Sequence, residues 1–264
     1  MVRKLLKKPY RLLINSSKGV LNFFLPTARI LLYHRVEDVI NDPHKLCVNK
    51  NNFHSQIKFL KENFNIIPLV KLVQSIRKGR VDNNTIAITF DDGYADNLYN
   101  ALPVLKEFKV PATVFLAAGY IGRNRPRPFY WDQNTPEIGQ GKPMTLAEVK
   151  RLSSSRLIEI GGHTINHPKL ASLSENEQFK EISGGKKILE NALNIPLLSF
   201  AYPFGDEKSF TAQTVSLVKK VGYSYACANI RARVTARSDI YALPRFVVRN
   251  WGLEEFKSEF NKFI

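Results

Sequence analysis

The stretch "TIAITFDDG" (85–93) joins a run of apolar and β-branched residues directly to two neighbouring aspartates. A short run of this kind, followed by a glycine, predicts a buried strand that ends at residue 90. Asp91 and Asp92 carry like charges, and burying either carboxylate without a partner is costly. The stretch therefore predicts a strand that ends at a site where a cationic group lies close to the carboxylates.

Similar short runs recur along the chain, at residues 29–34, 112–117, 157–163, 197–203 and 223–229. Helical patterns lie between them, and two of these begin with the spacing of a capping box: Thr145 with Glu148, and Ser174 with Glu177. The alternation of strand and helix from about residue 85 predicts βα units around a parallel sheet. We therefore expect an α/β fold in which the sheet closes into a barrel, with functional side chains where strands end.

The chain has 264 residues, is 44% hydrophobic and carries a formal net charge of +16, which fits one large globular domain. We divide it into a basic N-terminal extension (1–28) and a barrel domain (29–264). The first 35 residues contain eight Lys or Arg and no acidic residue. Two interpretations stay open: the arm binds an anionic membrane or polymer through a weakly amphipathic helix at 12–25, or it is a solvated basic helix.

The sequence favours a cytoplasmic location or one at the membrane periphery. Polar residues 15–18 interrupt the apolar part of the N-terminal segment, unlike a secretory signal, and no run is long enough to span a bilayer. We expect no nucleic acid partner, since no reading motif accompanies the charge. Cys47 and Cys227 lie far apart, so neither a disulfide framework nor a thiolate metal site is indicated.

Two histidines follow another predicted strand, in "GGHTINHP" (161–168). His163 and His167 are four residues apart, so one helical turn or a tight loop can aim both imidazoles at one point. With Asp92 they would form a set of two histidines and one carboxylate, which leaves metal positions open for water. Asp91, turned the other way, would then hold that water.

Three motifs, "TFDDG" (89–93), "HTINHP" (163–168) and "FAYPFG" (200–205), resemble those of the polysaccharide deacetylases, the NodB-homology or carbohydrate esterase family 4 enzymes. The resemblance extends from "LLYHRV" (31–36) through "LPRFVV" (243–248). It implies a deformed (β/α) barrel that removes N-acetyl groups from amino sugars with a divalent metal ion, usually zinc.

Carried over to this chain, the resemblance makes Asp91 the catalytic base and makes Asp92, His163 and His167 the metal ligands. The base accepts a proton from water, and a tetrahedral oxyanion forms. Backbone N–H groups stabilise such an oxyanion, and the family's donor corresponds to the amide of Phe204, because the preceding proline has no N–H. We also assign Tyr202 and Trp251 to substrate binding.

The chain departs from the family pattern at two positions. The third motif commonly begins with an arginine that orients the base, but Ala201 stands there. Arg245 is the candidate replacement, although an arginine near a chain end is more often part of a surface ion pair. The usual general acid is a C-terminal histidine, but no histidine follows His167. His34 fits a permuted branch of the family with an N-terminal "YH" motif; the alternative is a core histidine that ends a strand.

Three functions remain open. The first is a metal-dependent amidase acting on an N-acetylated sugar in a polysaccharide or glycan precursor. The second is a deformylase acting on a lipid-linked N-formyl amino sugar, which the basic arm would suit. The third is an inactive glycan-binding relative. The complete set of Asp91, Asp92, His163 and His167 favours an enzyme.

Overall fold

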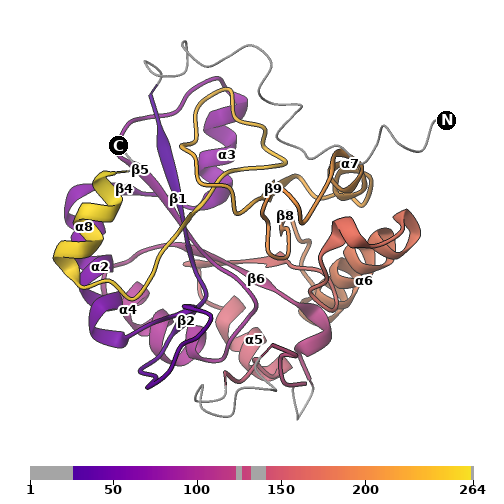
Figure 1. Ribbon diagram of the computed structural model, residues 1–264, viewed down its shortest axis with the longest axis horizontal. Coiled ribbons are helices and arrows are strands. Elements are labelled where there is room, and N and C mark those ends of the chain that lie inside the picture. Colours follow the sequence, from indigo (N-terminus) through magenta and orange to yellow (C-terminus); the bar gives the residue numbers. More distant parts are fainter. Residues whose placement is uncertain (1–25, 123–126, 132–140, 263–264) are drawn as a thin grey trace.

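The computed structural model describes residues 26–122, 127–131 and 141–262. Its centre is a parallel sheet in the order β10-β1-β5-β6-β7-β8-β9 (Figure 1). The strands are β1 (Ala28–Tyr33), β5 (Thr85–Phe90), β6 (Ala112–Leu116), β7 (Ile158–Gly162), β8 (Ser199–Ala201), β9 (Tyr225–Cys227) and β10 (Phe246–Val247). Each of the six predicted strands is confirmed within a few residues. The short β10 was not expected, because its two residues give no periodic signal.

The sheet curls until its two edges meet. Leu243 forms a parallel bridge to Cys227 of β9, and β10, three residues later, pairs with β1. The expected deformed (β/α) barrel is therefore confirmed. Shorter strands complete the set: β4 (Asn65–Ile66) pairs with the beginning of β5, and β2 (Arg35–Val36) pairs with β3 (Cys47–Val48) in a separate ribbon.

Helices surround the sheet on its outer side (Figure 1). They are α2 (Lys50–Asn63), α3 (Leu69–Arg77), α4 (Leu102–Glu107), α5 (Leu146–Ser153), α6 (Glu175–Leu193), α7 (Ala212–Lys220) and α8 (Leu253–Asn261). Short helical turns occupy Asn97–Ala101, Ala118–Tyr120 and Leu170–Ser172. Both predicted capping boxes are present, at the beginning of α5 and of α6.

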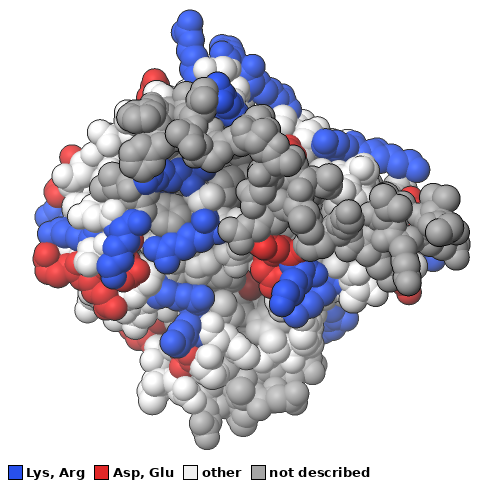
Figure 2. Space-filling view, turned by 45° about the horizontal axis from the view of Figure 1, so that its top comes forward, with Lys and Arg blue, Asp and Glu red and all other residues white. Residues whose placement is uncertain are grey.

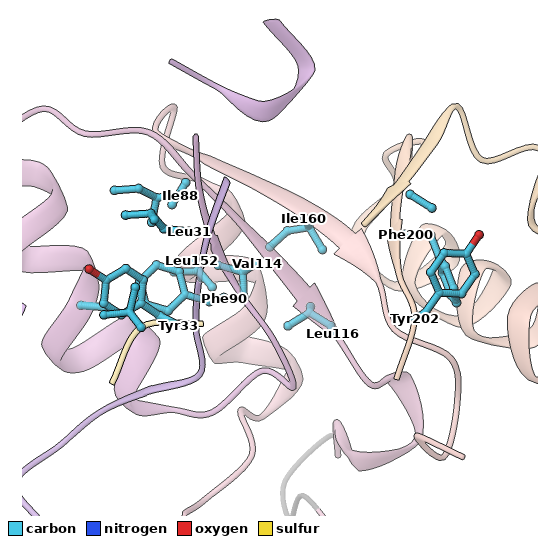
Figure 3. Packing of buried hydrophobic residues seen from close by; sticks show 14 of the residues in the cluster. Leu31, Tyr33, Ile88, Phe90, Val114, Leu116, Leu152, Ile160, Phe200 and Tyr202 are labelled. Atoms are coloured by element: carbon cyan, nitrogen blue, oxygen red, sulfur yellow. The ribbon is translucent and has the colours of Figure 1, made fainter. Parts of the chain in front are cut away.

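Alternate residues of each strand pack into two different layers, as the two-residue period of a strand requires. Leu31 and Tyr33 of β1 belong to the layer between sheet and helices, together with Phe90 of β5 (Figure 3). Ala28 and Ile30 belong to a second apolar cluster, which they share with Phe115 and Cys227 of neighbouring parts of the sheet. The strands are thus covered on both faces, which explains why they appear in the sequence as continuous apolar runs.

The strand register brings residues that follow different strands to one end of the barrel. Tyr33, the last residue of β1, is the pairing partner of Phe90, the last residue of β5. The amide of Asp91 continues this ladder by donating to the carbonyl of Tyr33 at 3.1 Å. His34 and Asp91 therefore leave their strands side by side at the carboxyl end of the sheet.

Most of the expected N-terminal extension lies outside the described residues, and β1 begins at Ala28, one residue before the expected domain boundary. Within the described ranges, none of the helices combines the length and the apolar character needed to cross a bilayer.

Candidate metal centre and active site

A tight turn separates the two aspartates. The amide of Gly93 donates to the carbonyl of Asp91 at 3.0 Å, and Asp92 between them has a φ of 74°. This is a γ-turn, a conformation that is strained for a residue with a side chain. Both carboxylates are buried, each with only 4% exposure. Because of this turn the two side chains point in different directions. Asp92 faces the two histidines, and Asp91 faces Arg245.

The two histidines lie on a tight loop after β7, so of the two expected geometries the structure has the loop. Thr164 and His167 both have positive φ, and the Thr164 hydroxyl accepts a hydrogen bond from the His167 amide at 3.0 Å. Gly185 of α6 packs against this loop so closely that a Cβ there would lie 2.7 Å from the Thr164 backbone. The loop thus depends on α6 for its shape.

Asp92, His163 and His167 form a buried group whose ligand atoms lie within 4.8 Å of one another. The Nδ1–H of His163 donates to the Ala201 carbonyl at 2.7 Å, so in the neutral ring Nε2, which is directed at the cluster, is the atom free to bind a metal. Asp92 Oδ1 lies 3.5 Å from that Nε2 and 3.4 Å from the Nε2 of His167. Asp92 Oδ1 is buried and accepts no hydrogen bond within the described structure. An acceptor oxygen and two imidazole nitrogens converging in this way fit a divalent ion such as zinc.

Electrostatics act differently on the three groups. Burial would lower the pKa of His163, but the charges of Asp91 and Asp92 outweigh it and raise that pKa. Burial alone would raise the pKa of the Asp92 carboxyl, but the facing imidazoles outweigh it and lower that pKa to about 2. Burial lowers the pKa of His167 to about 3, although the Asp92 charge opposes the change. A carboxylate and a neutral imidazole are the forms that bind metal.

Arg245 holds the second aspartate. Its Nη1 and Nη2 each donate to one carboxylate oxygen of Asp91 at 2.7 Å, and its Nε donates to the carbonyl of Ala228 at 3.0 Å. The side chain is buried, so the surface ion pair considered from the sequence is not what forms. Burial would raise the pKa of Asp91, but the Arg245 charge outweighs it and keeps that pKa below its usual value. Asp91 is thus a fixed carboxylate beside the metal candidates.

His34 follows β1 at the same end of the barrel and is partly exposed. Its main-chain carbonyl accepts a hydrogen bond from Asn97 at 2.8 Å. Desolvation lowers the pKa of its imidazole, and the charges of Asp92 and Asp91 oppose that effect. The structure therefore brings His34 into the electrostatic field of both aspartates.

Phe204 is the centre of a second γ-turn, with a φ of 60° and a hydrogen bond from the Gly205 amide to the Pro203 carbonyl at 2.7 Å. Its ring lies 4.9 Å from the ring of His167. The ring of Phe204, the residue at the expected oxyanion position, therefore borders the metal candidates.

The two expected substrate-binding residues are not brought into this group. Tyr202 is buried: its ring stacks on Phe210 at 4.0 Å and its hydroxyl donates to the Tyr241 carbonyl. Assigning its side chain to substrate was wrong, because alternation along β8 turns it outward into the layer beneath the helices. Trp251 packs against Phe246 at 5.8 Å, next to that same layer.

Sequence reasoning missed two neighbours of the histidines. The ring of Trp131 lies 4.6 Å from that of His167, and its indole N–H donates to the Tyr94 hydroxyl at 2.7 Å. The aromatic run "FYW" (129–131) was the available signal, but it lies inside a Pro-rich segment without a strand or helix pattern. Glu181 of α6 accepts from the amides of Ile165 and Asn166 at 3.0 and 2.9 Å. Nothing in the sequence distinguishes Glu181 from a solvated helix residue.

This chain is similar to several known proteins. YxkH of Bacillus subtilis (strain 168) is 28% identical over 218 residues, which cover 82% of this chain and 69% of that protein. Poly-beta-1,6-N-acetyl-D-glucosamine N-deacetylase of Staphylococcus aureus (strain MSSA476) is 26% identical over 228 residues, 82% of this chain and 72% of its own. The structure of IcaB from Ammonifex degensii superposes with a TM-score of 0.73 at 20% identity, covering 90% of this chain and 97% of that one.

The family model described as polysaccharide deacetylase matches residues 78–226, which contain both aspartates and both histidines. This match spans more than half of the sequence. The chain therefore belongs to the polysaccharide deacetylase family.

Proposed function

We propose that this protein is a metal-dependent hydrolase that removes N-acetyl groups from amino sugars of a polysaccharide. The observation that carries the proposal is Asp92 Oδ1, which is buried without a hydrogen bond between the Nε2 atoms of His163 and His167. A divalent cation would satisfy all three atoms at once, because a carboxylate oxygen and two imidazole nitrogens are the ligand types that such an ion takes. The ligands are then Asp92, His163 and His167.

The protein's own groups account for the proton transfers. A divalent ion bound by these three residues supplies Lewis acidity toward the amide carbonyl and lowers the pKa of water. Asp91, fixed by Arg245, accepts the proton of the attacking water. The amide of Phe204 donates to the oxygen that becomes negative in the tetrahedral intermediate. His34 gives a proton to the departing amine, which cannot leave as an anion.

The substrate class follows from the family and from the relatives. The name of the Staphylococcus aureus relative specifies an N-acetylated glucosamine polymer. We infer a related N-acetylglucosamine polymer or glycan precursor for this protein. Deformylation of a lipid-linked N-formyl sugar is the second candidate, which the basic arm favours. An inactive glycan-binding role is disfavoured, because all four residues of the set converge in the structure.

The experiment is to incubate the zinc-loaded protein with N-acetylglucosamine oligomers, peptidoglycan fragments and lipid-linked N-formyl sugars, and to measure released acetate and formate separately. Acetate release from the oligomers supports the proposal. Formate release alone would select the deformylase, and binding without either product would select the inactive relative.

The metal assignment has its own test. His163→Ala and His167→Ala should each abolish metal binding and turnover together, because each removes one of three ligands. Elemental analysis after dialysis measures the loss directly. His54→Ala is the matched control, since His54 is an exposed helical residue bonded to Glu107. Unchanged metal content in either ligand variant contradicts the site.

We further propose contact with an anionic membrane through the amino end of the barrel. The chain enters β1 at this end, directly after the basic residues 1–25 (Figure 1). The last turns of α3 and α7 and the connections that lead from helices back to strands there carry these exposed basic residues: Arg77, Lys78, Arg80, Lys109, Arg156, Lys219 and Lys220. Figure 2 turns this end forward and shows Lys and Arg at several places on the described surface. The active site lies at the opposite end of the strands, so this orientation would leave it open to a glycan.

A vesicle experiment tests the contact. Deleting residues 1–25 should weaken sedimentation with vesicles containing anionic lipid and leave hydrolysis of a small soluble substrate intact. Added salt should weaken binding of the full chain, because the attraction is screened electrostatics. Equal sedimentation with and without the arm contradicts a role for the arm.

A further inference from the structure

Glu181 of α6 lies beside the loop that carries the two histidines. Its Oε2 accepts hydrogen bonds from the backbone amides of Ile165 and Asn166 at 3.0 and 2.9 Å. Its Oε1 accepts a third hydrogen bond, from the side-chain amide of Asn166 at 2.7 Å. All three donors belong to the two residues that stand between Thr164 and His167 in the chain. One carboxylate therefore ties the middle of the loop to the helix.

The loop has a backbone shape that its own residues do not favour. Thr164 and His167 have φ values of 67° and 58°, in the left-handed region that is costly for residues with a side chain. The two amides between them turn toward α6, where Glu181 accepts them. A carboxylate makes stronger hydrogen bonds to N–H groups than a neutral acceptor does. Glu181 thus offsets part of the cost of this strained loop.

The same face of α6 also touches the loop by close packing. A Cβ at Gly185 would lie 2.7 Å from the Thr164 carbonyl, and one at Gly184 would lie 2.5 Å from the Ile165 side chain. Glycine is unfavourable inside a helix, so this pair makes room for the loop at a cost to α6. Glu181 precedes the two glycines by three and four residues, which places it on their side of the helix.

The imidazoles of His163 and His167 come from the two ends of this loop, so its shape sets how they converge. Their Nε2 atoms lie 3.5 and 3.4 Å from the same Asp92 oxygen. The His163 ring is oriented by its own hydrogen bond to the Ala201 carbonyl. The Nδ1 of His167 is buried and has no hydrogen-bond partner within the described ranges. The position of the His167 ring therefore depends on its backbone and on the aromatic rings around it.

We infer that Glu181 is a positioning residue for the metal. It holds the loop so that the imidazole of His167 meets the same ion as Asp92 and His163. It acts through the loop backbone and is not itself a member of the ligand group. This inference rests on the proposed function, since it concerns the metal site of that reaction. It makes metal affinity depend on a residue of α6.

The test measures zinc affinity by competition with a chelator, in the absence of substrate. Glu181→Ala removes all three acceptor bonds and should weaken zinc binding by roughly tenfold or more, the size of effect found when outer partners of metal ligands are lost. Glu181→Gln keeps an acceptor oxygen for the two backbone amides and should recover most of that affinity. Absorption bands of the cobalt-substituted protein, which report ligand geometry, should change more in Glu181→Ala than in Glu181→Gln. If Glu181→Ala does not fold, Glu181→Asp replaces it, because the shorter side chain withdraws the carboxylate from the amides.

Glu190→Ala is the matched control. Glu190 also lies on α6 and accepts the amide of a connecting residue, Leu197, at 2.8 Å, but this connection leads into β8 at the amino end of the barrel. Both alanine variants should lower the stability of the metal-free protein in urea, and only Glu181→Ala should weaken zinc binding. Parent zinc affinity in Glu181→Ala overturns the inference. Equal weakening in both alanine variants also overturns it, because it would show a general effect on the fold.

Acetate release from N-acetylglucosamine oligomers is measured in parallel. Release by the parent, together with parent zinc affinity in Glu181→Ala, rejects the role of Glu181 and keeps the deacetylase. The expected order of zinc affinities without acetate release keeps the role of Glu181 and rejects the deacetylase.

Discussion

Arg245 and Asp91 are joined by two parallel hydrogen bonds of 2.7 Å inside the barrel, although 154 residues separate them in the chain. The fork geometry of the guanidinium matches a carboxylate, and both groups are almost completely buried. Arg245 therefore fixes the Asp91 carboxylate from the segment that leads into β10, whereas position 201 carries an alanine.

Replacing Arg245 with Lys should keep the positive charge but remove the pair of parallel hydrogen bonds to Asp91. We expect kcat to fall by roughly tenfold or more, because the carboxylate is no longer held in one orientation.

The Arg245 charge also keeps the pKa of Asp91 low. In Arg245→Met that pKa rises, so the acid limb of the kcat/KM profile should move to higher pH, since the carboxylate is the working form. Arg237→Lys, an exposed change at the other end, is the control, and an unmoved limb contradicts the role.

Asp91→Asn separates the base from the ligands. The variant should retain its metal, because Asp91 is not in the ligand group, and lose roughly a hundredfold or more of its turnover. Leaving Arg245 buried without its carboxylate should also lower the free energy of unfolding by roughly 3–5 kcal/mol. Metal analysis, turnover and chemical denaturation measure the three effects. Asp92→Asn is the contrasting variant and should lose metal; the reverse pattern would exchange the two roles.

His34→Ala should keep the metal and the fold. We expect it to slow amide hydrolysis far more than hydrolysis of an activated ester, because an ester leaving group needs little protonation. The ratio of the two rates is the measurement, and it does not respond to a general structural defect. Equal losses on both substrates return His34 to a purely structural position at the end of β1.

Glu159, near the beginning of β7 and away from the active site, is expected to make the stability of the protein depend on pH. Its Oε1 accepts hydrogen bonds of 2.6 Å from Ser199 and Tyr225, while its Oε2 is buried without a partner within the described structure. Burial raises the pKa of this carboxyl above 4.5. The protonated Glu159 carboxyl therefore contributes its full stabilisation of the fold below pH 4.5. This contribution is lost as the pH rises through the raised pKa of Glu159.

Glu159→Gln keeps an acceptor oxygen and cannot ionise. We expect its free energy of unfolding to decline less than that of the parent between roughly pH 5 and pH 8, as measured by urea denaturation. Glu62→Gln, at an exposed position, should follow the parent curve. Parallel curves for Glu159→Gln and the parent would show that this carboxyl does not affect stability in that range.

The sequence by itself determined the features that depend on local periodicity. The strand 85–90 begins and ends in the structure where the apolar run does, and both capping boxes form at the predicted residues. The metal candidates could also be predicted, because parallel strands bring their carboxyl ends to one edge and the ligands lie in the segments that follow β5 and β7. The proximity of Asp92 and His163 could therefore be predicted without knowing how the segments between them pack.

Only the tertiary structure decided which distant groups complete the site. Whether Arg245 reaches Asp91 depends on barrel closure through Leu243 and β10, and no local pattern encodes that closure. The contact of Trp131 with His167 likewise depends on how an irregular segment folds back. Tyr202 was misassigned because a motif gives the position of a residue but not the face on which its side chain lies. That face is set by the strand register, a long-range property of the sheet.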